Sequence, residues 1–166
     1  VFAVFMLLPF AATGLRGQLR VLSRRDWMLI FLAGLFLGGH FLTWIASLYH
    51  TSVASATVIV SASPIFLAVL GYLLLREHLQ WHVILAIVIA FAGAALIGWG
   101  DRSLEAFPNA NLGNLLSLIA CLLVSAYLLI GRVVRRGTSW LAYVFPLYTA
   151  VAVTTVATAI LFGEQL

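Results

Sequence analysis

The sequence predicts an all-α integral membrane protein, a polytopic bundle of membrane-spanning helices. Of its 166 residues, 64% are hydrophobic and only 8% are charged. Soluble domains carry about 25% charged residues, so this chain would expose large apolar patches in water. Disorder is excluded too, because disordered chains combine low hydrophobicity with high net charge. The formal charge of +4 does not indicate a nucleic-acid partner, since its arginines form short clusters between apolar runs.

Five apolar runs are long enough to cross a hydrocarbon core of about 30 Å, which takes about 20 helical residues. They are Trp27–Tyr49, Val53–Leu75, Trp81–Trp99, Leu112–Gly131 and Trp140–Phe162. Helices are expected because the runs lack the polar–apolar alternation of barrel strands. The opening segment, Val1–Leu15, is apolar but short. We expect it to be the second part of a further helix, and the chain to be a fragment of a longer protein.

The placement of the arginines predicts the orientation of the chain. Eight of the nine arginines lie in the connections 16–26, 76–80 and 132–139, which share one side if every run crosses once. The opposite connections, 50–52 and 100–111, contain Arg102 alone. Because positive loops face the cytoplasm, the three arginine-rich loops are expected to be cytoplasmic, in the inner membrane. Their contact with anionic lipid would explain the arginines without any nucleic acid.

One helical face of the first full run is polar. With about 100° between successive residues, four side chains fall within roughly 60° of one another. They are His40, Trp44, Ser47 and Thr51. Polar groups inside a bilayer usually face a bundle interior or a wet cavity. This face is therefore expected either to line a substrate cavity or to form hydrogen bonds between packed helices.

The second full run combines small and hydroxylated residues with a proline. The residues expected to share a face are Thr57, Ser61, Pro64, Ala68 and Gly71. Pro64 lacks an N–H and clashes with the carbonyl of Val60, so the helix should bend there. In lipid, the freed carbonyl needs a protein neighbour or a wet cavity. A substrate pocket or a moving gate would use such a face, and close packing alone is the alternative.

The remaining runs offer packing signals and no sign of an enzyme. In the third run, small residues recur every four positions, as in faces where helices approach closely: Ala86, Ala90, Ala94 and Gly98. No carboxylate lies well inside any run, and the chain has no phosphate-binding loop or metal-spaced cluster. The lone Cys121 is expected to be a small residue facing lipid or the core. No catalytic activity, metal or cofactor is predicted.

Three consecutive motifs resemble a known family. An apolar helix ending in Ser47-Leu48-Tyr49-His50-Thr51 leads into a helix start rich in small residues. Ser63-Pro64-Ile65-Phe66 and then Leu75-Arg76-Glu77-His78-Leu79 follow. This succession resembles the EamA domain of the drug/metabolite transporter (DMT) superfamily. The resemblance is close over residues 24–100 and general over 112–162.

The resemblance implies ten helices in two five-helix repeats, the second inverted because each repeat has an odd number of helices. Residues 1–100 would form the first repeat without its first helix. Residues 101–111 would be an extracytoplasmic loop, and 112–166 the first two helices of the second repeat. At the cytoplasmic turn, Arg76 and Glu77 match the family motif. They are expected to stabilise the adjoining helix ends, and a gating salt bridge is the alternative.

The function implied is that of a secondary carrier that moves a small metabolite by alternating access, with export as the expected direction. Its partners would be the metabolite and the lipid bilayer, and a homodimer is left open. His40, Trp44 and Ser47 would line the cavity. Facing them would be Thr57, Ser61 and Pro64. The rival hypothesis is a non-transporting membrane scaffold or subunit, in which these polar faces serve only packing.

Overall fold

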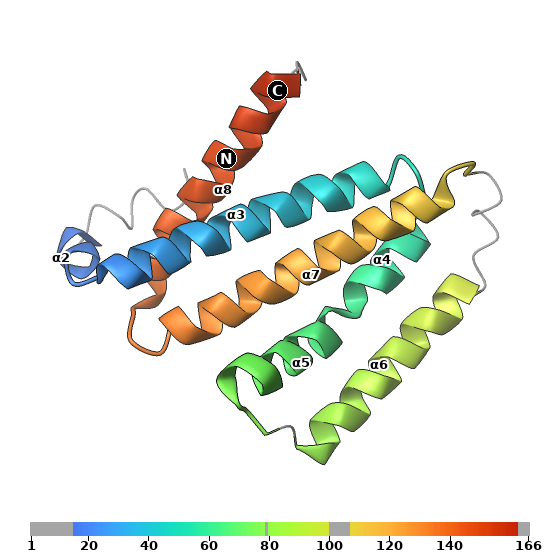
Figure 1. Cartoon of the computed structure of the whole chain (residues 1–166), viewed down its shortest axis with the longest axis horizontal. Helices are drawn as coiled ribbons and strands as arrows, with labels where there is room; N and C mark the ends of the chain where they lie inside the picture. The colour runs from blue at the N-terminus through green and yellow to red at the C-terminus, as the bar shows by residue number, and fades with distance from the viewer. Residues whose placement is uncertain (1–14, 79, 100–106, 163–166) are drawn as a thin grey trace. The chain divides into compact units, whose positions relative to one another are not determined.

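A computed structural model describes residues 15–78, 80–99 and 107–162, and in these residues every regular element is a helix. In chain order the helices are α2 (Leu15–Arg20), α3 (Arg24–Ser47), α4 (Val53–Ser61), α5 (Ser63–Leu75), α6 (Trp81–Trp99), α7 (Ala110–Val134) and α8 (Trp140–Phe162) (Figure 1). By length and composition, four described segments can cross a membrane: Arg24–Ser47, Val53–Leu75, Ala110–Val134 and Trp140–Leu161. The predicted all-α, polytopic membrane class is confirmed.

The fifth expected span is α6, and the bounds of several other elements differ from those predicted. The described apolar stretch of α6, Trp81–Gly93, is shorter than the four spans above. The connection 16–26 contains α2 and the start of α3, and α7 extends beyond the predicted Leu112–Gly131 at both ends. The expected partial helix before residue 15 and the loop over 100–106 lie outside the described residues.

The early start of α3 has a local cause in the sequence. The backbone N–H of Asp26 donates to Ser23 Oγ at 3.1 Å, and the N–H of Ser23 donates to Asp26 Oδ2 at 3.0 Å. This reciprocal capping box satisfies backbone donors that the first helical turn leaves unpaired. The helix therefore begins at Arg24, three residues before the apolar run.

The chain divides into two compact units that share α3 and α7. Unit 1 comprises the described residues of Val1–Gly39 and Tyr127–Leu166, and unit 2 comprises those of His40–Ala126. Unit 1 thus holds α2, the first part of α3, the end of α7 and α8. Unit 2 holds the end of α3, then α4, α5, α6 and the first part of α7.

Unit 1 has an apolar core built from α3, α7 and α8. Its buried members are Ile30, Ala33, Leu37, Val134, Tyr143, Leu147 and Val151. Two glycines bring α3 and α8 together, because a Cβ on Gly34 would lie 2.5 Å from Ala150 Cβ and one on Gly38 would lie 3.2 Å from Thr154 Cβ. This Gly-x-x-x-Gly contact lets the two backbones approach closely. The sequence analysis missed it, although the spacing is plain in the sequence.

One end of unit 1 joins two of the arginine-rich connections. Helix α2 packs against α8. Ser139, which precedes α8, donates its hydroxyl to Gln18 Oε1 and accepts the Ala142 N–H at 3.3 Å. The connections 16–26 and 132–139 therefore meet at the same end of unit 1.

In unit 2, α4 packs against α6, and the second span is broken into α4 and α5 at Ala62. Pro64 lies in the first turn of α5, where a missing N–H is tolerated. The expected face does not continue to Gly71, although its residues from Thr57 to Pro64 share the same exposure across the break. Thr57, Ser61 and Pro64 are exposed, whereas Gly71 is buried.

The small-residue face expected on α6 makes no close contact at its described positions. Ala86 is exposed, and a Cβ on the neighbouring Gly93 would have no atom within 4 Å. The side chains at 90, 94 and 98 lie outside the described residues. In the described part of unit 1, the close contact between small residues is instead made by Gly34 and Gly38 of α3 against α8.

Candidate transport site

The polar face of α3 lies against α7 in unit 2. His40 is buried with 8% of its surface exposed, and its Nδ1 lies 2.9 Å from the carbonyl oxygen of Ala120. A carbonyl only accepts, so Nδ1 carries the proton and a neutral imidazole has its free lone pair on Nε2. The imidazole therefore joins α3 to α7.

Ser47 and Thr51 continue this interface, and both are fully buried. Ser47 Oγ donates to the carbonyl of Trp44 at 2.6 Å, and Thr51 Oγ1 donates to Asn114 Oδ1 at 2.9 Å. Gly113 allows the close approach, because a Cβ there would lie 2.7 Å from the backbone nitrogen of Thr51. In Figure 1 the end of α3 and the start of α7 lie side by side. Thr51 and Gly113 thus join the end of this segment to α7, whereas the hydroxyl of Ser47 is paired within α3.

Trp44 differs from its neighbours on this face. Its indole Nε1 is buried and has no hydrogen-bond partner among the described residues, and the same holds for Ser117 Oγ on α7. Ser117 lies between Asn114 and Ala120, so it stands at the level where α3 carries Trp44. Leaving a buried donor unpaired costs about 1–3 kcal/mol. Trp44 on α3 and Ser117 on α7 therefore each carry a buried donor without a partner among the described residues.

The second half of the expected cavity stands apart from the first. Thr57 and Pro64 are exposed, and so is Ser61, whose Oγ donates to the carbonyl of Val58 at 2.7 Å. No hydrogen bond among the described residues joins these three to the polar face of α3. The structure thus places both predicted sets in unit 2, with no hydrogen bond between them among the described residues.

Helix α7 also contacts the break in the second span. Cys121 Sγ donates to the carbonyl of Val60 at 3.7 Å, and Ser125 Oγ donates to the carbonyl of Ser63 at 3.1 Å. The neighbour expected for the Val60 carbonyl is therefore Cys121. Cys121 was expected only as a small residue facing lipid or the core, and Ser125 was not singled out. Their spacing of one helical turn, opposite a proline-containing helix, is the signal that could have found them.

The backbone of Arg76 and Glu77, the residues of the turn motif, ends α5. Arg76 ends α5 in the left-handed conformation, with φ 54° and ψ 34°, and the N–H of Glu77 donates to the carbonyl of Gly71 at 3.2 Å. A non-glycine residue in this conformation costs roughly 1–2 kcal/mol. The pair therefore forms the helix stop from which the chain turns toward α6.

Residues 1–99 match the EamA-like transporter family, which is more than half of the chain. The chain belongs to that family. It is 28% identical over 108 residues to the "Uncharacterized transporter YetK" of Bacillus subtilis (strain 168). That match covers 63% of this chain but 33% of the relative, so the chain spans about a third of the length of the curated relative it matches. No solved structure matches the chain.

In this EamA-like chain, the matched region holds every residue predicted to line the cavity or form the turn motif, from His40 to Glu77. The packing partners described above, from Asn114 to Ser125, lie beyond it. The family supports a DMT-type, multi-pass membrane transporter and points away from an enzyme. No group of three or more metal-ligating side chains occurs in the described part of the chain.

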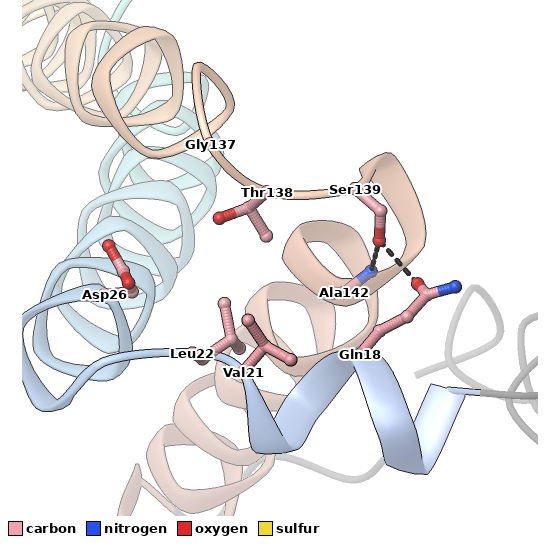
Figure 2. Close-up of a pocket in the computed structure, with 8 residues that line it drawn as sticks. All are labelled: Gln18, Val21, Leu22, Asp26, Gly137, Thr138, Ser139 and Ala142. Carbon is pink, nitrogen blue, oxygen red and sulfur yellow. Dashed lines mark hydrogen bonds between the residues drawn. The ribbon is translucent and has the colours of Figure 1, made fainter.

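A polar pocket of about 210 Å³ lies at one end of unit 1, between the α2–α3 turn and the start of α8 (Figure 2). It is lined by Gln18, Val21, Leu22, Asp26, Gly137, Thr138, Ser139 and Ala142. The Asp26 carboxylate caps α3, and the Ser139 hydroxyl caps α8 and contacts Gln18. Since the Asp26 and Ser139 side chains are already used at the helix ends, we assign this pocket to the packing of the two connections and not to solute binding.

Proposed function

We propose that this EamA-like chain is part of a secondary carrier that moves small metabolites across the inner membrane by alternating access, in the direction of export. The observation that carries the proposal is the indole N–H of Trp44, which is buried and has no acceptor among the described residues. A hydrogen-bond acceptor on a transported solute would remove that cost. The complete carrier would have ten helices in two inverted repeats.

Among the four polar residues predicted on this face, the hydrogen bonds leave Trp44 as the one proposed to contact a solute. His40, Ser47 and Thr51 are held by Ala120, the Trp44 carbonyl and Asn114. The indole N–H of Trp44, on the same helix, has no hydrogen-bond partner among the described residues. The exposed hydroxyls of Thr57 and Ser61 on α4 supply further polar groups for a solute in the complete protein.

The proposed orientation places the arginine-rich loops in the cytoplasm. The hydrogen bond between Gln18 and Ser139 supports a shared side for two of these loops, because it joins them at one end of unit 1. The metabolite and the surrounding lipid are the proposed partners.

A non-transporting scaffold is the second candidate. It is favoured by two of these pairings, since His40 bonds to Ala120 and Thr51 to Asn114, and both bonds join α7 to the preceding segment. The two functions differ at Trp44. A scaffold has no use for its indole N–H, whereas a carrier loses a solute contact when the N–H is removed.

The experiment measures uptake and efflux of a metabolite panel by cells that produce the full-length protein. Trp44→Phe keeps an aromatic ring and removes the N–H, so it should raise the KM for the transported metabolite about tenfold, as for one lost hydrogen bond. Trp140→Phe is the matched control, since Trp140 lies at the start of α8 and is 58% exposed. Equal transport by both variants, or no transport of any metabolite above empty cells, would favour the scaffold.

A further inference from the structure

The break between α4 and α5 leaves backbone groups that the helix itself does not pair in the usual way. Pro64 cannot donate to the Val60 carbonyl as a regular fourth residue would. The N–H of Ala62 turns back to Ile59 O at 3.2 Å, and α5 restarts with the N–H of Ile65 donating to Ala62 O at 2.9 Å. Helix α7 supplies the additional donors through Cys121 and Ser125.

Both donors from α7 can be withdrawn at low cost. A thiol is a weak donor, and the Cys121 sulfur lies 3.7 Å from Val60 O. The hydroxyl of Ser125 has one hydrogen and two acceptors within reach, Ser63 O at 3.1 Å and Cys121 O in its own helix at 2.7 Å. When the contact with Ser63 is lost, the hydroxyl keeps a partner in α7. The interface can therefore part without leaving a buried hydroxyl unpaired.

We infer that Cys121 and Ser125 form a releasable latch on the break at Ala62, so that α4 and α5 change their bend when the latch opens. This inference rests on the proposed transport function, because alternating access requires a segment with two arrangements. The latch acts on the exposed residues Thr57 and Ser61, which lie on α4 just before the break. Cys121 and Ser125 are positioning residues in this scheme.

The latch contains its own reporter. Cys121 is the one cysteine of this sequence, and it is fully buried in the latched arrangement. Its sulfur is reached by a membrane-permeant maleimide only when α7 separates from the break. The rate at which N-ethylmaleimide modifies Cys121, followed by mass spectrometry of the peptide that contains it, therefore measures opening.

The experiment uses the full-length protein in membranes, below its unfolding temperature and without any solute. In the unaltered protein, Cys121 should be modified at a higher rate than the whole protein unfolds. Ser125→Ala should raise the rate of modification about threefold to tenfold. Ser117→Ala is the matched control. Ser117 lies on the same buried face of α7, one turn before Cys121, and has no hydrogen-bond partner among the described residues. Its removal should leave the rate unchanged.

Two results would overturn the latch. One is a Cys121 that reacts in the unaltered protein only after denaturation. The other is an equal acceleration by Ser117→Ala and Ser125→Ala, which would indicate general loosening. Because no solute is added, the result does not depend on the metabolite panel. A carrier with a static break would fail this test and pass the transport assay, whereas a scaffold with a mobile break would do the opposite.

Discussion

Unit 1 packs α3 against α8 through two glycines and an apolar core, whereas unit 2 adds side-chain hydrogen bonds from α7 to the close glycine contact at Gly113. In lipid there is no hydrophobic drive between helices, so both close packing and hydrogen bonds must supply association. A glycine contact such as that of Gly34 has no alternative arrangement, since any shift opens a gap or creates a clash. A hydroxyl can exchange one carbonyl for another. In the proposed carrier, unit 1 would be the fixed part and unit 2 would hold the part that moves.

The largest effect is expected where unit 1 is tightest. Gly34→Ala would place a Cβ 2.5 Å from Ala150 Cβ and 3.1 Å from the carbonyl oxygen of Leu147. Overpacking of this kind costs about 1–3 kcal/mol, so the midpoint of thermal unfolding in detergent should fall. Adding Ala150→Gly removes the nearest atom and should restore much of the loss.

The control for this substitution is Gly93→Ala on α6, where an added Cβ meets no atom within 4 Å. Alanine is also the better helix former, by about 1 kcal/mol, so this variant should be at least as stable as the unaltered protein. If Gly34→Ala unfolds at the same temperature as Gly93→Ala, the close approach of α3 and α8 is not the contact that holds unit 1 together.

The second prediction removes a hydrogen bond from unit 2. Thr51→Val keeps the shape of a fully buried side chain but deletes the donor to Asn114 Oδ1. Interhelical hydrogen bonds in membrane proteins are worth about 0.6 kcal/mol on average and up to about 1.7 kcal/mol. The thermal midpoint should therefore fall by less than it does for Gly34→Ala. In a double-mutant cycle with Asn114→Ala, the two losses should not add.

The smallest effect, with the opposite sign, is expected for a hydroxyl of unit 1. Tyr143 is buried in the apolar core, and its hydroxyl has no hydrogen-bond partner among the described residues. A Cβ on Gly131 would lie only 2.6 Å from that oxygen, so the site is also crowded. Tyr143→Phe should leave the thermal midpoint unchanged or raise it. The corresponding gain in the free energy of unfolding is up to about 1 kcal/mol. A clear loss of stability would show that unit 1 also depends on polar contacts.

The helices and the fold class could be predicted because each membrane span is a continuous run of apolar residues in the sequence. The bend before Pro64 was also local, since it follows from one missing N–H. What failed was the extension of the Thr57 face to Gly71, which is buried, because the burial of a residue depends on the helices around it. The small-residue pattern was assigned to α6, while α3 carries the Gly34–Gly38 contact, because spacing alone does not tell which face meets a partner.

The candidate site divides in the same way. The sequence predicted one polar face from His40 to Thr51, but α3 ends at Ser47, so Thr51 lies in the turn that follows. The sequence left open whether these residues face a solute or another helix, because that depends on what α7 presents more than 60 residues later. The asymmetry between Trp44 and its neighbours could not be found from either helix alone.

By itself, the sequence determined that this chain is a helical membrane protein of the EamA type, because hydrophobicity and the turn motif around Arg76 and Glu77 are carried by neighbouring residues. Only the tertiary structure decided how each polar group is used. Cys121 and Ser125 meet carbonyls of α4 and α5 across about 60 residues of chain, and Trp44 meets no acceptor. A hydrogen bond needs a partner at a given distance and angle, and residue spacing within one helix does not specify that partner.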